Sequence, residues 1–255
     1  MNTERTNLYK VALDGTKEPK SRVCLEEHEL EIVVNEKTMY HLVCTQDRLK
    51  ELVYGRLYTD RIIDSAEDVK LFFLCRSEHT ATVLLDAQKM PEPILDKELS
   101  CCSANHRFCD VEGKRQLHPI GKHEVDWEKV FYLTRVFQDD RGLHGDTAAV
   151  HKSILLLTGD NGANETVCFE DIGRHNTVDK AVGFAILNHI DLSTCMVFTS
   201  GRVPVDMTEK LIAAGVPVLV SKSVPTADSV RMAKQYGLSL ICRAWPDGCE
   251  LYSPV

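Results

Sequence analysis

The sequence predicts an α/β protein whose second half is built on a largely parallel sheet, with a smaller α+β subdomain before it. Short apolar runs with strand character alternate in the second half with helical patterns of about 10 to 15 residues, which is typical of βαβ units. Gly215 and Gly237 stand directly after two of these helical patterns, where helices commonly end.

The composition is that of an ordinary globular protein. The chain has 255 residues, of which 44% are hydrophobic and 27% charged, and its net charge is −8. An acidic chain is a poor generic binder of nucleic acid. No apolar stretch approaches the roughly 18 residues that span a bilayer, and the polar N-terminus lacks a signal-peptide pattern. We therefore expect a cytoplasmic protein with no membrane or nucleic-acid partner.

The first part of the chain predicts a small mixed subdomain. Residues 1–22 are polar and are expected to form a loose lead-in with at most one strand. Alternating or apolar runs predict strands at 30–35, 41–45, 71–75 and 80–85, the last two paired with each other. Thr45 or Asp47 is expected to cap the helix that follows the second strand.

The remainder divides into an irregular stretch and a regular half. Residues 91–125 contain Pro and Gly but little apolar periodicity, and an irregular stretch of this length usually serves function. Beyond it, strands are predicted at 154–157, 196–199, 216–220 and 238–242, and helices at 127–137, 178–189, 204–214 and 227–236. The expected organisation is an N-terminal subdomain (1–98), a cysteine-bearing loop (99–125) and a C-terminal α/β subdomain (126–255).

The most polar segment is Glu170–Lys180, which lies between an apolar run and a helical pattern. Polar residues at a strand-to-helix turn occupy the place where α/β folds put their binding sites. Gly173 permits a tight bend there, and Arg174 and His175 would face an anion at the helix start. Asp179 and Lys180 are expected to form an internal ion pair. A helix start with ordinary acidic residues is the alternative interpretation.

Ten cysteines are present, and only three of them cluster: Cys101, Cys102 and Cys109. Arg107 or a protonated His106 nearby would favour a reactive thiolate. The same cysteines with His106 are also the residue types that bind zinc, although their spacing matches no standard zinc motif. A loop with incidental cysteines remains a third interpretation. Five others lie in apolar runs and are expected to be inert core residues: Cys44, Cys75, Cys168, Cys195 and Cys242.

Three further turns are candidates for a site. His144 lies between glycines, and imidazole titrates near neutrality. Ser200-Gly201-Arg202 follows a strand and precedes a helix, and the segment 221–226, which contains Lys222, repeats this layout after the next strand. Two such turns at neighbouring strand ends would form a joint anion site suited to a nucleotide or a phosphorylated cofactor. Two ordinary capped helices are the alternative.

Together these stretches resemble the FdhD family of formate dehydrogenase accessory sulfurtransferases. The similarity is most specific over Glu170–Lys180, where the family carries a nearly identical run. It extends in the same order along most of the chain, through Leu30–Asn35, Glu51–Ile63, Gly142-Leu143-His144, Ser200-Gly201-Arg202, Ala214–Pro217 and Val224–Thr226.

The resemblance implies a function and a fold. Members of the family take sulfur from a cysteine desulfurase as a cysteine persulfide and pass it to the molybdenum cofactor with two pterin guanine dinucleotides, for formate dehydrogenase. The implied fold of the C-terminal half is cytidine deaminase-like, and pairing as homodimers is implied as well. The zinc signature of the deaminases is absent here, so deamination is not expected and no resident metal is predicted.

The resemblance assigns the site residues, with two departures from the family pattern. Cys102 takes the place of the persulfide cysteine, Cys101 would take it in an alignment shifted by one, and neither has a second cysteine three residues later. The C-terminal loop that contacts the guanine nucleotide in relatives is rearranged here and contains Arg243, Trp245, Pro246 and Gly248.

We therefore expect Cys102 to carry the persulfide, with His144 orienting the cofactor or donating a proton. The residues expected to contact the polyanionic cofactor are Gly173, Arg174, His175, Ser200, Arg202, Lys222, Arg243, Trp245, Pro246 and Gly248. The competing functions are a cofactor-binding chaperone without sulfur chemistry and a zinc protein that uses Cys102, His106 and Cys109.

Overall fold

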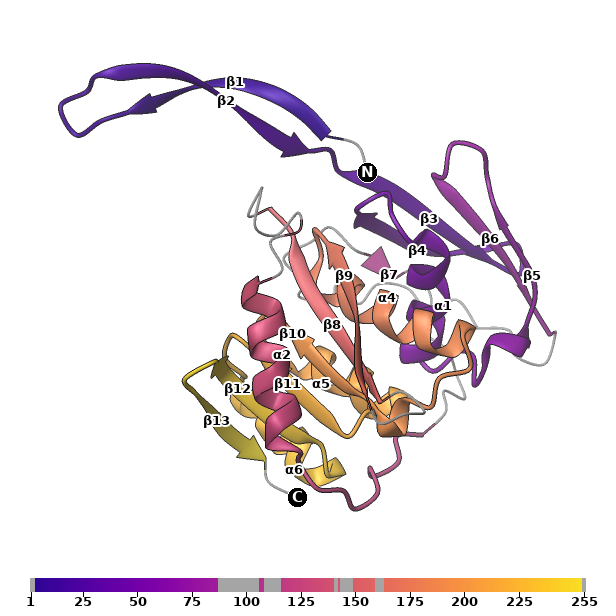
Figure 1. The fold of residues 1–255 in the computed structure, drawn as a ribbon. Coiled ribbons are helices and arrows are strands. Elements are labelled where there is room, and N and C mark those ends of the chain that lie inside the picture. Colours follow the sequence, from indigo (N-terminus) through magenta and orange to yellow (C-terminus); the bar gives the residue numbers. More distant parts are fainter. Residues whose placement is uncertain are drawn as a thin grey trace.

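Two sheets are joined through helices α1 (Leu49–Thr59) and α4 (Arg174–Leu187). A two-stranded arm projects from the N-terminal sheet (Figure 1). The computed structural model describes residues 3–86, 106–107, 116–139, 142, 149–158 and 163–253. The mixed α/β class predicted from the sequence is confirmed.

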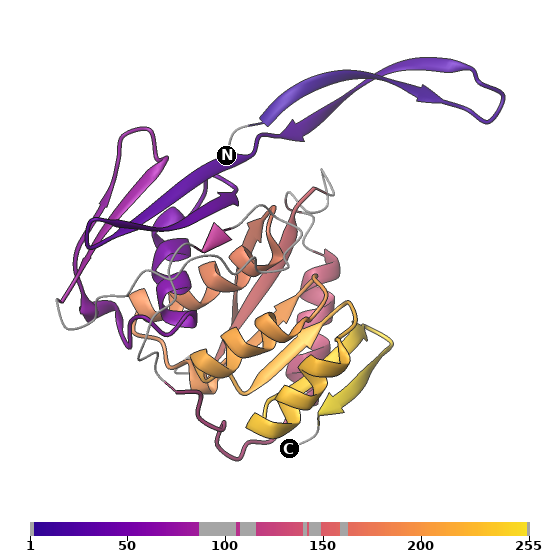
Figure 2. The same ribbon diagram turned by 180° about the vertical axis from the view of Figure 1, so that it is seen from behind.

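The arm consists of β1 (Thr3–Val11) and β2 (Lys17–Leu25), an antiparallel pair that forms a sheet of its own. Both views show it running away from the rest of the chain (Figures 1 and 2). The prediction of a loose lead-in with at most one strand was wrong. The two strands pair with each other instead of burying one face in the core, so the polar composition did not reveal them.

The N-terminal sheet has the strand order β5-β6-β3-β4-β7, in which only β3 and β6 run parallel. Its strands are β3 (His28–Val34), β4 (Lys37–Cys44), β5 (Val69–Leu74), β6 (Thr80–Leu85) and β7 (His106–Arg107). Alternate residues such as Leu30, Ile32 and Val83 are buried against α1 (Leu49–Thr59), because successive side chains of a strand point to opposite faces. The four strands predicted here are confirmed: β6 has the predicted bounds, and the other three begin two to four residues earlier and end one residue earlier than predicted.

The start of α1 differs from the prediction. Neither Thr45 nor Asp47 caps the helix. Its N-cap is Arg48, which has a left-handed backbone (φ 49°) and makes no side-chain capping bond. Thr45 binds a residue of the C-terminal subdomain instead, and no pattern local to the helix start could reveal that partner.

The C-terminal sheet has the order β13-β12-β11-β10-β8-β9. Its strands are β8 (His151–Thr158), β9 (Asn164–Asp171), β10 (Met196–Thr199), β11 (Val218–Ser221), β12 (Ser239–Trp245) and β13 (Gly248–Ser253). Only β10–β11 and β11–β12 are parallel, so the prediction of a largely parallel sheet was wrong. Two antiparallel hairpins, β8–β9 and β12–β13, flank this parallel centre. The prediction failed because an apolar run in the sequence does not show in which direction its strand will run in the sheet.

Helices cover both faces of this sheet. One face packs on α4 (Arg174–Leu187), α5 (Val205–Ala214) and α6 (Ala227–Tyr236), and the other on α2 (Trp127–Asp139). Figure 2 shows the first three from the side opposite to Figure 1. Gly215 and Gly237 have left-handed φ values of 73° and 74° at the ends of α5 and α6, which confirms them as C-terminal caps. Two short 3₁₀ helices complete the described elements, at Ala66–Asp68 and Leu192–Thr194. The division into three regions and the cytidine deaminase-like half stay predictions.

The contact between α1 and α4 depends on two glycines that face each other's backbone. A Cβ on Gly55 would lie 1.7 Å from the Asp179 carbonyl oxygen, and a Cβ on Gly183 would lie 1.8 Å from that of Glu51. Any side chain larger than hydrogen would force the helices apart. The two subdomains are therefore joined at backbone contact distance.

We expect Gly183→Ala to lower the free energy of unfolding by about 1–3 kcal/mol, because overpacking outweighs the gain of about 0.5–1 kcal/mol in helix propensity. Urea denaturation measures this change. Gly121→Ala is the matched control, since a Cβ there meets nothing within 4 Å. Equal stability of the two variants would contradict the close contact.

Candidate functional site

The candidate site lies at one edge of the C-terminal sheet, where five strands begin or end. Asp171 at the end of β9 pairs with His151 at the start of β8. Thr199 at the end of β10 is in register with Ser153 of β8 and with Ser221 of β11. The last residues of β12 reach the same edge, because β12 runs parallel to β11. The turns that follow β9, β10 and β11 therefore lie side by side along this edge.

Asp171 is fully buried, and its carboxylate accepts contacts from both subdomains. Oδ2 accepts from the backbone N–H and the hydroxyl of Thr45 at 3.1 Å each, and Lys180 Nζ lies 2.7 Å away. Oδ1 accepts from the Gly173 N–H at 2.9 Å and from Asn176 Nδ2 at 2.8 Å. Asn176 Nδ2 also donates to a backbone carbonyl of β4, at Val43. This part of the polar segment serves the fold.

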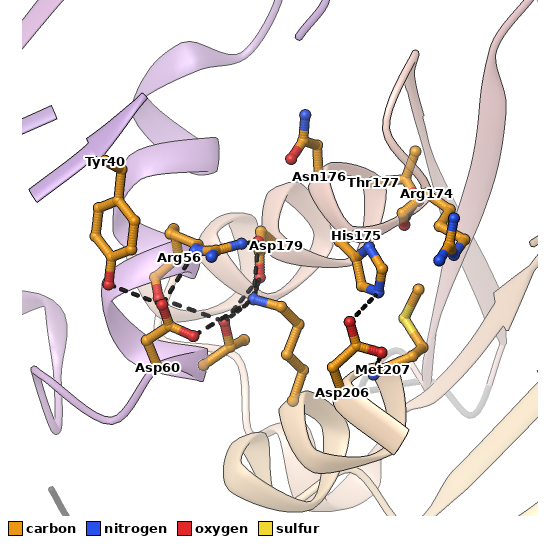
Figure 3. A network of polar contacts seen from close by, with 12 residues as sticks. Tyr40, Arg56, Asp60, Arg174, His175, Asn176, Thr177, Asp179, Asp206 and Met207 are labelled. Atoms are coloured by element: carbon orange, nitrogen blue, oxygen red, sulfur yellow. Dashed lines mark hydrogen bonds and ion pairs between the residues drawn. The ribbon is translucent and has the colours of Figure 1, made fainter. Parts of the chain in front are cut away.

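Asp179 belongs to a second buried cluster, between α1, α4 and α5 (Figure 3). Lys210 Nζ lies 2.7 Å from Asp179 Oδ1, and the Thr59 hydroxyl donates to the same oxygen at 2.7 Å. Arg56 bridges Asp179 and Asp60 at 3.6 and 3.0 Å. The prediction that Asp179 and Lys180 pair with each other was wrong. Adjacent helix residues point in different directions, so Asp179 binds Lys210 and Lys180 binds Asp171.

His175 is buried and faces Asp206 on α5, with Nε2 2.9 Å from Oδ2 (Figure 3). The contact is close, although Nε2 does not meet hydrogen-bond geometry there. Burial lowers the pKa of the imidazole, and this effect exceeds the opposing influence of Asp206. His175 is therefore a neutral, inward-facing group at neutral pH. Its predicted role in cofactor binding stays a prediction.

Arg174 leaves the start of α4 on the side away from the Asp179 cluster (Figure 3). Its aliphatic stem lies against Gly201, where a Cβ would come within 2.9 Å of the Arg174 Cβ. Its buried Nε has no hydrogen-bond partner among the residues that the structure describes. Buried donors are normally satisfied, and an acceptor atom of a ligand would satisfy this one.

The turn 200–202 is fixed to the neighbouring strands by its own polar groups. The Ser200 hydroxyl accepts from the Lys152 N–H at 3.0 Å, and the Ser200 N–H donates to the Lys152 carbonyl at 2.8 Å. The Ser221 hydroxyl donates to the Gly201 carbonyl at 2.8 Å and so connects this turn to the next. The predicted adjacency of the two turns is confirmed. Arg202 is exposed at their outer side.

Lys222 lies between two aromatic rings. Its Nζ is 5.3 Å from the ring centroid of Phe137 and 5.0 Å from that of Trp245, within the range of cation–π attraction. Trp245 remains 43% exposed. A half-exposed ring beside a fixed ammonium offers one face for stacking and one charge for a phosphate.

The hairpin β12–β13 supplies the remaining predicted residues. Arg243 is exposed with a left-handed backbone (φ 46°), and its N–H donates to the Ser223 carbonyl at 2.9 Å. Its Nε lies 3.6 Å from Glu250, which offsets part of its charge. Pro246 is exposed in the turn, and Gly248 pairs with Trp245 across the hairpin.

Several predicted residues lie outside the described part of the chain: Cys101, Cys102, Cys109 and His144. For His106 only the backbone is described, and it pairs with His41 of β4. Gly142 is described, and a Cβ there would lie 2.6 Å from Glu170 Oε1. Within the described ranges, no group of three or more His, Cys, Asp or Glu side chains would hold a metal ion.

Not all cysteines of the apolar runs are core residues. Cys44, Cys195 and Cys242 are buried, and burial raises the pKa of each thiol. Cys75 lies at the turn between β5 and β6, where the hydrogen bond with Ser77 lowers its pKa to about 7. The prediction of an inert core residue was wrong for Cys75, because its run ends at the surface.

Sequence reasoning missed the partners that hold the site. The sequence did not single out three of these partners: Lys152, Asp206 and Lys210. Lys152 is fully buried, and its Nζ lies 3.5 Å from Glu170 Oε1. A lysine inside the apolar strand pattern at 151–157 was the available signal, since a buried lysine requires a partner.

A cavity of about 500 Å³ lies at the opposite edge of the same sheet, between residues 116–123 and the end of α5. Its walls contain none of the predicted site residues. Among the residues that the structure describes, every helix lacks the length or the apolar composition that a membrane span requires.

These features define an α/β protein in which two sheets are joined through α1 and α4 and cationic side chains lie at one edge of the C-terminal sheet. Residues 25–255 match the FdhD/NarQ family, and the chain belongs to that family. It is 29% identical over 226 residues to the sulfur carrier protein FdhD of Bacillus pumilus, covering 87% of this chain and 85% of that protein. The protein of the same description from Sulfurisphaera tokodaii is 26% identical over 249 residues, covering 94% and 93%.

The fold has a solved counterpart. The crystal structure described as a formate dehydrogenase accessory protein from Desulfotalea psychrophila superimposes with a TM-score of 0.77 at 20% identity. The match covers 99% of this chain and 97% of that one. At this level of identity the likeness establishes the fold.

We expect the imidazole pKa of His175 to lie below its ordinary 6.5 and to fall further in Asp206→Asn, because the Asp206 charge favours the protonated ring. NMR titration of the ring measures both values. Asp228→Asn, on the exposed surface of α6, is the control and should leave the pKa unchanged.

The lowered pKa of His175 also determines how the stability of the fold changes with pH. The unfolded chain takes up the proton first as the pH falls below 6.5, so the folded protein loses stability in that window. His175→Gln should make the free energy of unfolding less dependent on pH there. An unchanged slope would contradict a buried neutral imidazole.

Proposed function

We propose that this protein is a sulfur carrier that accepts persulfide sulfur from a cysteine desulfurase and passes it to the molybdenum bis(molybdopterin guanine dinucleotide) cofactor of formate dehydrogenase. The family membership and the names of its relatives support this function. The structural observation that carries it is the row of cationic side chains at one sheet edge: Arg174, Arg202, Lys222 and Arg243. We also propose that the C-terminal half is cytidine deaminase-like and that the protein works in the cytoplasm.

The proposed cofactor is a polyanion, and the cationic edge of the C-terminal sheet is suited to bind it. The chain carries a net charge of −8, yet these four cations gather at three adjacent strand ends and one helix start. Arg174 offers an unpaired Nε, and guanidinium groups bind phosphate oxygens with good geometry. The acidic remainder of the surface would guide an anionic ligand toward this edge.

The guanine nucleotide is assigned to the Trp245 side of the edge. The exposed indole provides a stacking surface for the base, and Lys222 is held beside it by two rings. Arg243 would supply a second cation, in exchange for its contact with Glu250. The resemblance to the family implies a nucleotide contact in this loop, where Trp245 would provide the ring and Arg243 the charge.

The sulfur step requires one thiolate, which we assign to Cys102. Its attack on the terminal sulfur of a desulfurase persulfide forms one S–S bond as another breaks, and the desulfurase thiolate leaves, so no oxidant or reductant is consumed. His144 would orient the cofactor or donate a proton. Gly142, two residues before it in the sequence, lies beside the Glu170 side chain.

Incubation with a desulfurase and cysteine should add one sulfur atom to the wild type, read by mass spectrometry of the intact protein. Cys102→Ala should stay unloaded and Cys101→Ala should load normally, because only Cys102 takes the family position. Loading of Cys102→Ala but not of Cys101→Ala would assign the sulfur to Cys101.

Two other outcomes would replace the proposed function. Normal activation of formate dehydrogenase by a Cys101→Ala/Cys102→Ala double variant would favour a cofactor-binding chaperone. Stoichiometric zinc in the purified protein, lost on substitution of Cys102 or Cys109, would favour the zinc protein.

Guanosine diphosphate should bind at the edge, and Trp245→Ala should weaken it by about tenfold or more, since stacking of a base contributes about 1–3 kcal/mol. Isothermal titration calorimetry measures the dissociation constants. Trp127→Ala is the matched control, because Trp127 is 42% exposed, at the start of α2, away from the edge. Equal loss in both variants would refute the assignment.

Two lysine-to-alanine variants distinguish the phosphate contact of Lys222 from the stacking of the base on Trp245. Lys222→Ala should weaken the binding of guanosine diphosphate more than the binding of guanosine, whereas Lys234→Ala, at an exposed position on α6, should change neither affinity.

A further inference from the structure

The cavity of about 500 Å³ lies where β10 and β11 begin, at the end of the sheet opposite to the cationic edge. Its walls come from the end of α5, the 3₁₀ helix Leu192–Thr194, the segment 116–123 and Tyr58 in the last turn of α1. Small-molecule sites in proteins commonly have volumes of about 300–1,000 Å³. None of the residues that we assign to the molybdenum cofactor lines this cavity, so the proposed function does not use it.

The segment 116–123 is a fixed wall of the cavity. The Ile120 N–H donates to the Tyr236 carbonyl at the end of α6, at 2.8 Å. His123 Nδ1 donates to the Gly121 carbonyl at 2.9 Å, and His123 Nε2 lies 2.9 Å from the Ser239 hydroxyl at the start of β12. The Ile120 side chain packs against the core. The cavity is therefore formed without a ligand, as most small-molecule sites are.

One side of the cavity is apolar and open. It is lined by Ile212, Ala213 and Pro217, of which the first and last are buried. A Cβ built on Gly121 or on Gly215, which also line the cavity, would meet no atom within 4 Å. Transfer of an apolar group from water to such a surface is favourable. A ligand with an apolar body therefore suits this side.

The polar side of the cavity is cationic or neutral. Lys122 and His118 line it together with Gln116, Tyr58 and Ser193, and no Asp or Glu is among its described lining residues. This is unusual in a chain with 38 acidic and 30 basic side chains. Within the described part of the chain, neither Lys122 nor His118 makes an ion pair or a side-chain hydrogen bond. The ammonium and the imidazole N–H can therefore both donate to a carboxylate.

The end of α5 opposes an anion, but only weakly. The C-terminal end of a helix carries about half a negative elementary charge on its last carbonyl groups. Two of these carbonyls are already satisfied, since the Gly215 N–H donates to Ile212 and the Val216 N–H donates to Leu211, at 3.0 Å each. The full positive charge of Lys122 outweighs the partial charge that remains.

We propose that this cavity binds a small organic anion with an apolar body, of the class of a medium-chain carboxylate. Its carboxylate would accept from Lys122 and His118, and its hydrocarbon body would pack on Ile212, Ala213 and Pro217. The ligand thus differs from the polyanionic cofactor of the opposite edge, because the cavity offers one cationic corner and an apolar wall instead of a row of cations.

Octanoate and 1-octanol are matched probes, since they share the hydrocarbon chain and differ in charge. Titration of the full ¹⁵N-labelled chain, followed by NMR, should show saturable binding of octanoate with shifts of the backbone signals of residues 118–123 and 212–216. The alcohol should bind at the same place with at least about threefold lower affinity, which is the effect of one solvent-exposed ion pair.

Two substitutions separate the charge from the apolar wall. Lys122→Gln should lower the octanoate affinity about threefold or more and leave that of 1-octanol unchanged, whereas Lys70→Gln, at an exposed position on β5, should change neither. Ala213→Phe should weaken both probes, because the larger side chain occupies the cavity. Circular dichroism confirms that each variant is folded.

Three results would overturn the proposal. Absence of saturable octanoate binding would show that the cavity takes no such anion. Equal affinities of octanoate and 1-octanol, or an octanoate affinity unchanged by Lys122→Gln, would remove the role of the charge. Shifts centred on Lys222 and Trp245 would assign the anion to the cationic edge instead.

Discussion

The buried carboxylate of Asp171 is the contact on which the position of the site depends. It binds the start of the loop after β4 through Thr45, the start of α4 through Gly173 and Asn176, and the ammonium of Lys180. Because it holds the Gly173 N–H, it fixes where α4 begins, and so where Arg174 leaves the helix. A buried carboxylate with fewer donors would cost several kcal/mol, which explains why so many polar groups converge on it.

The contact between α1 and α4 likewise depends on buried charges that are paired. Gly55 and Gly183 let α1 and α4 meet at backbone distance, and this places Arg56, Asp60, Asp179 and Lys210 in one buried cluster. Each charge there has an opposite charge within 4 Å. Dense pairing offsets part of the cost of burial. It also makes the relative placement of the helices specific, because a shift of either helix would leave a buried charge without its partner.

The polar segment Glu170–Lys180 therefore has two roles on alternating sides of one helix start. Asp171, Asn176, Asp179 and Lys180 point inward and hold the subdomains together. Arg174 points to the sheet edge, where Gly201 makes room for its stem. Inward-facing and edge-facing residues are interleaved because a helix start exposes successive side chains to different surroundings.

The sequence alone determined the α/β class, most of the strands and helices, the caps at Gly215 and Gly237, and the adjacency of the turns at 200–202 and 221–226. These follow from periodicity and local turn chemistry, which a linear chain displays directly. The tertiary structure decided the strand directions, the arm, and the partners of Asp171, His175, Asp179 and Lys222. Those pairings join residues that are far apart in the sequence, such as Thr45 and Asp171. Strand direction and long-range charge pairing depend on how the elements meet in space, and no local pattern records that.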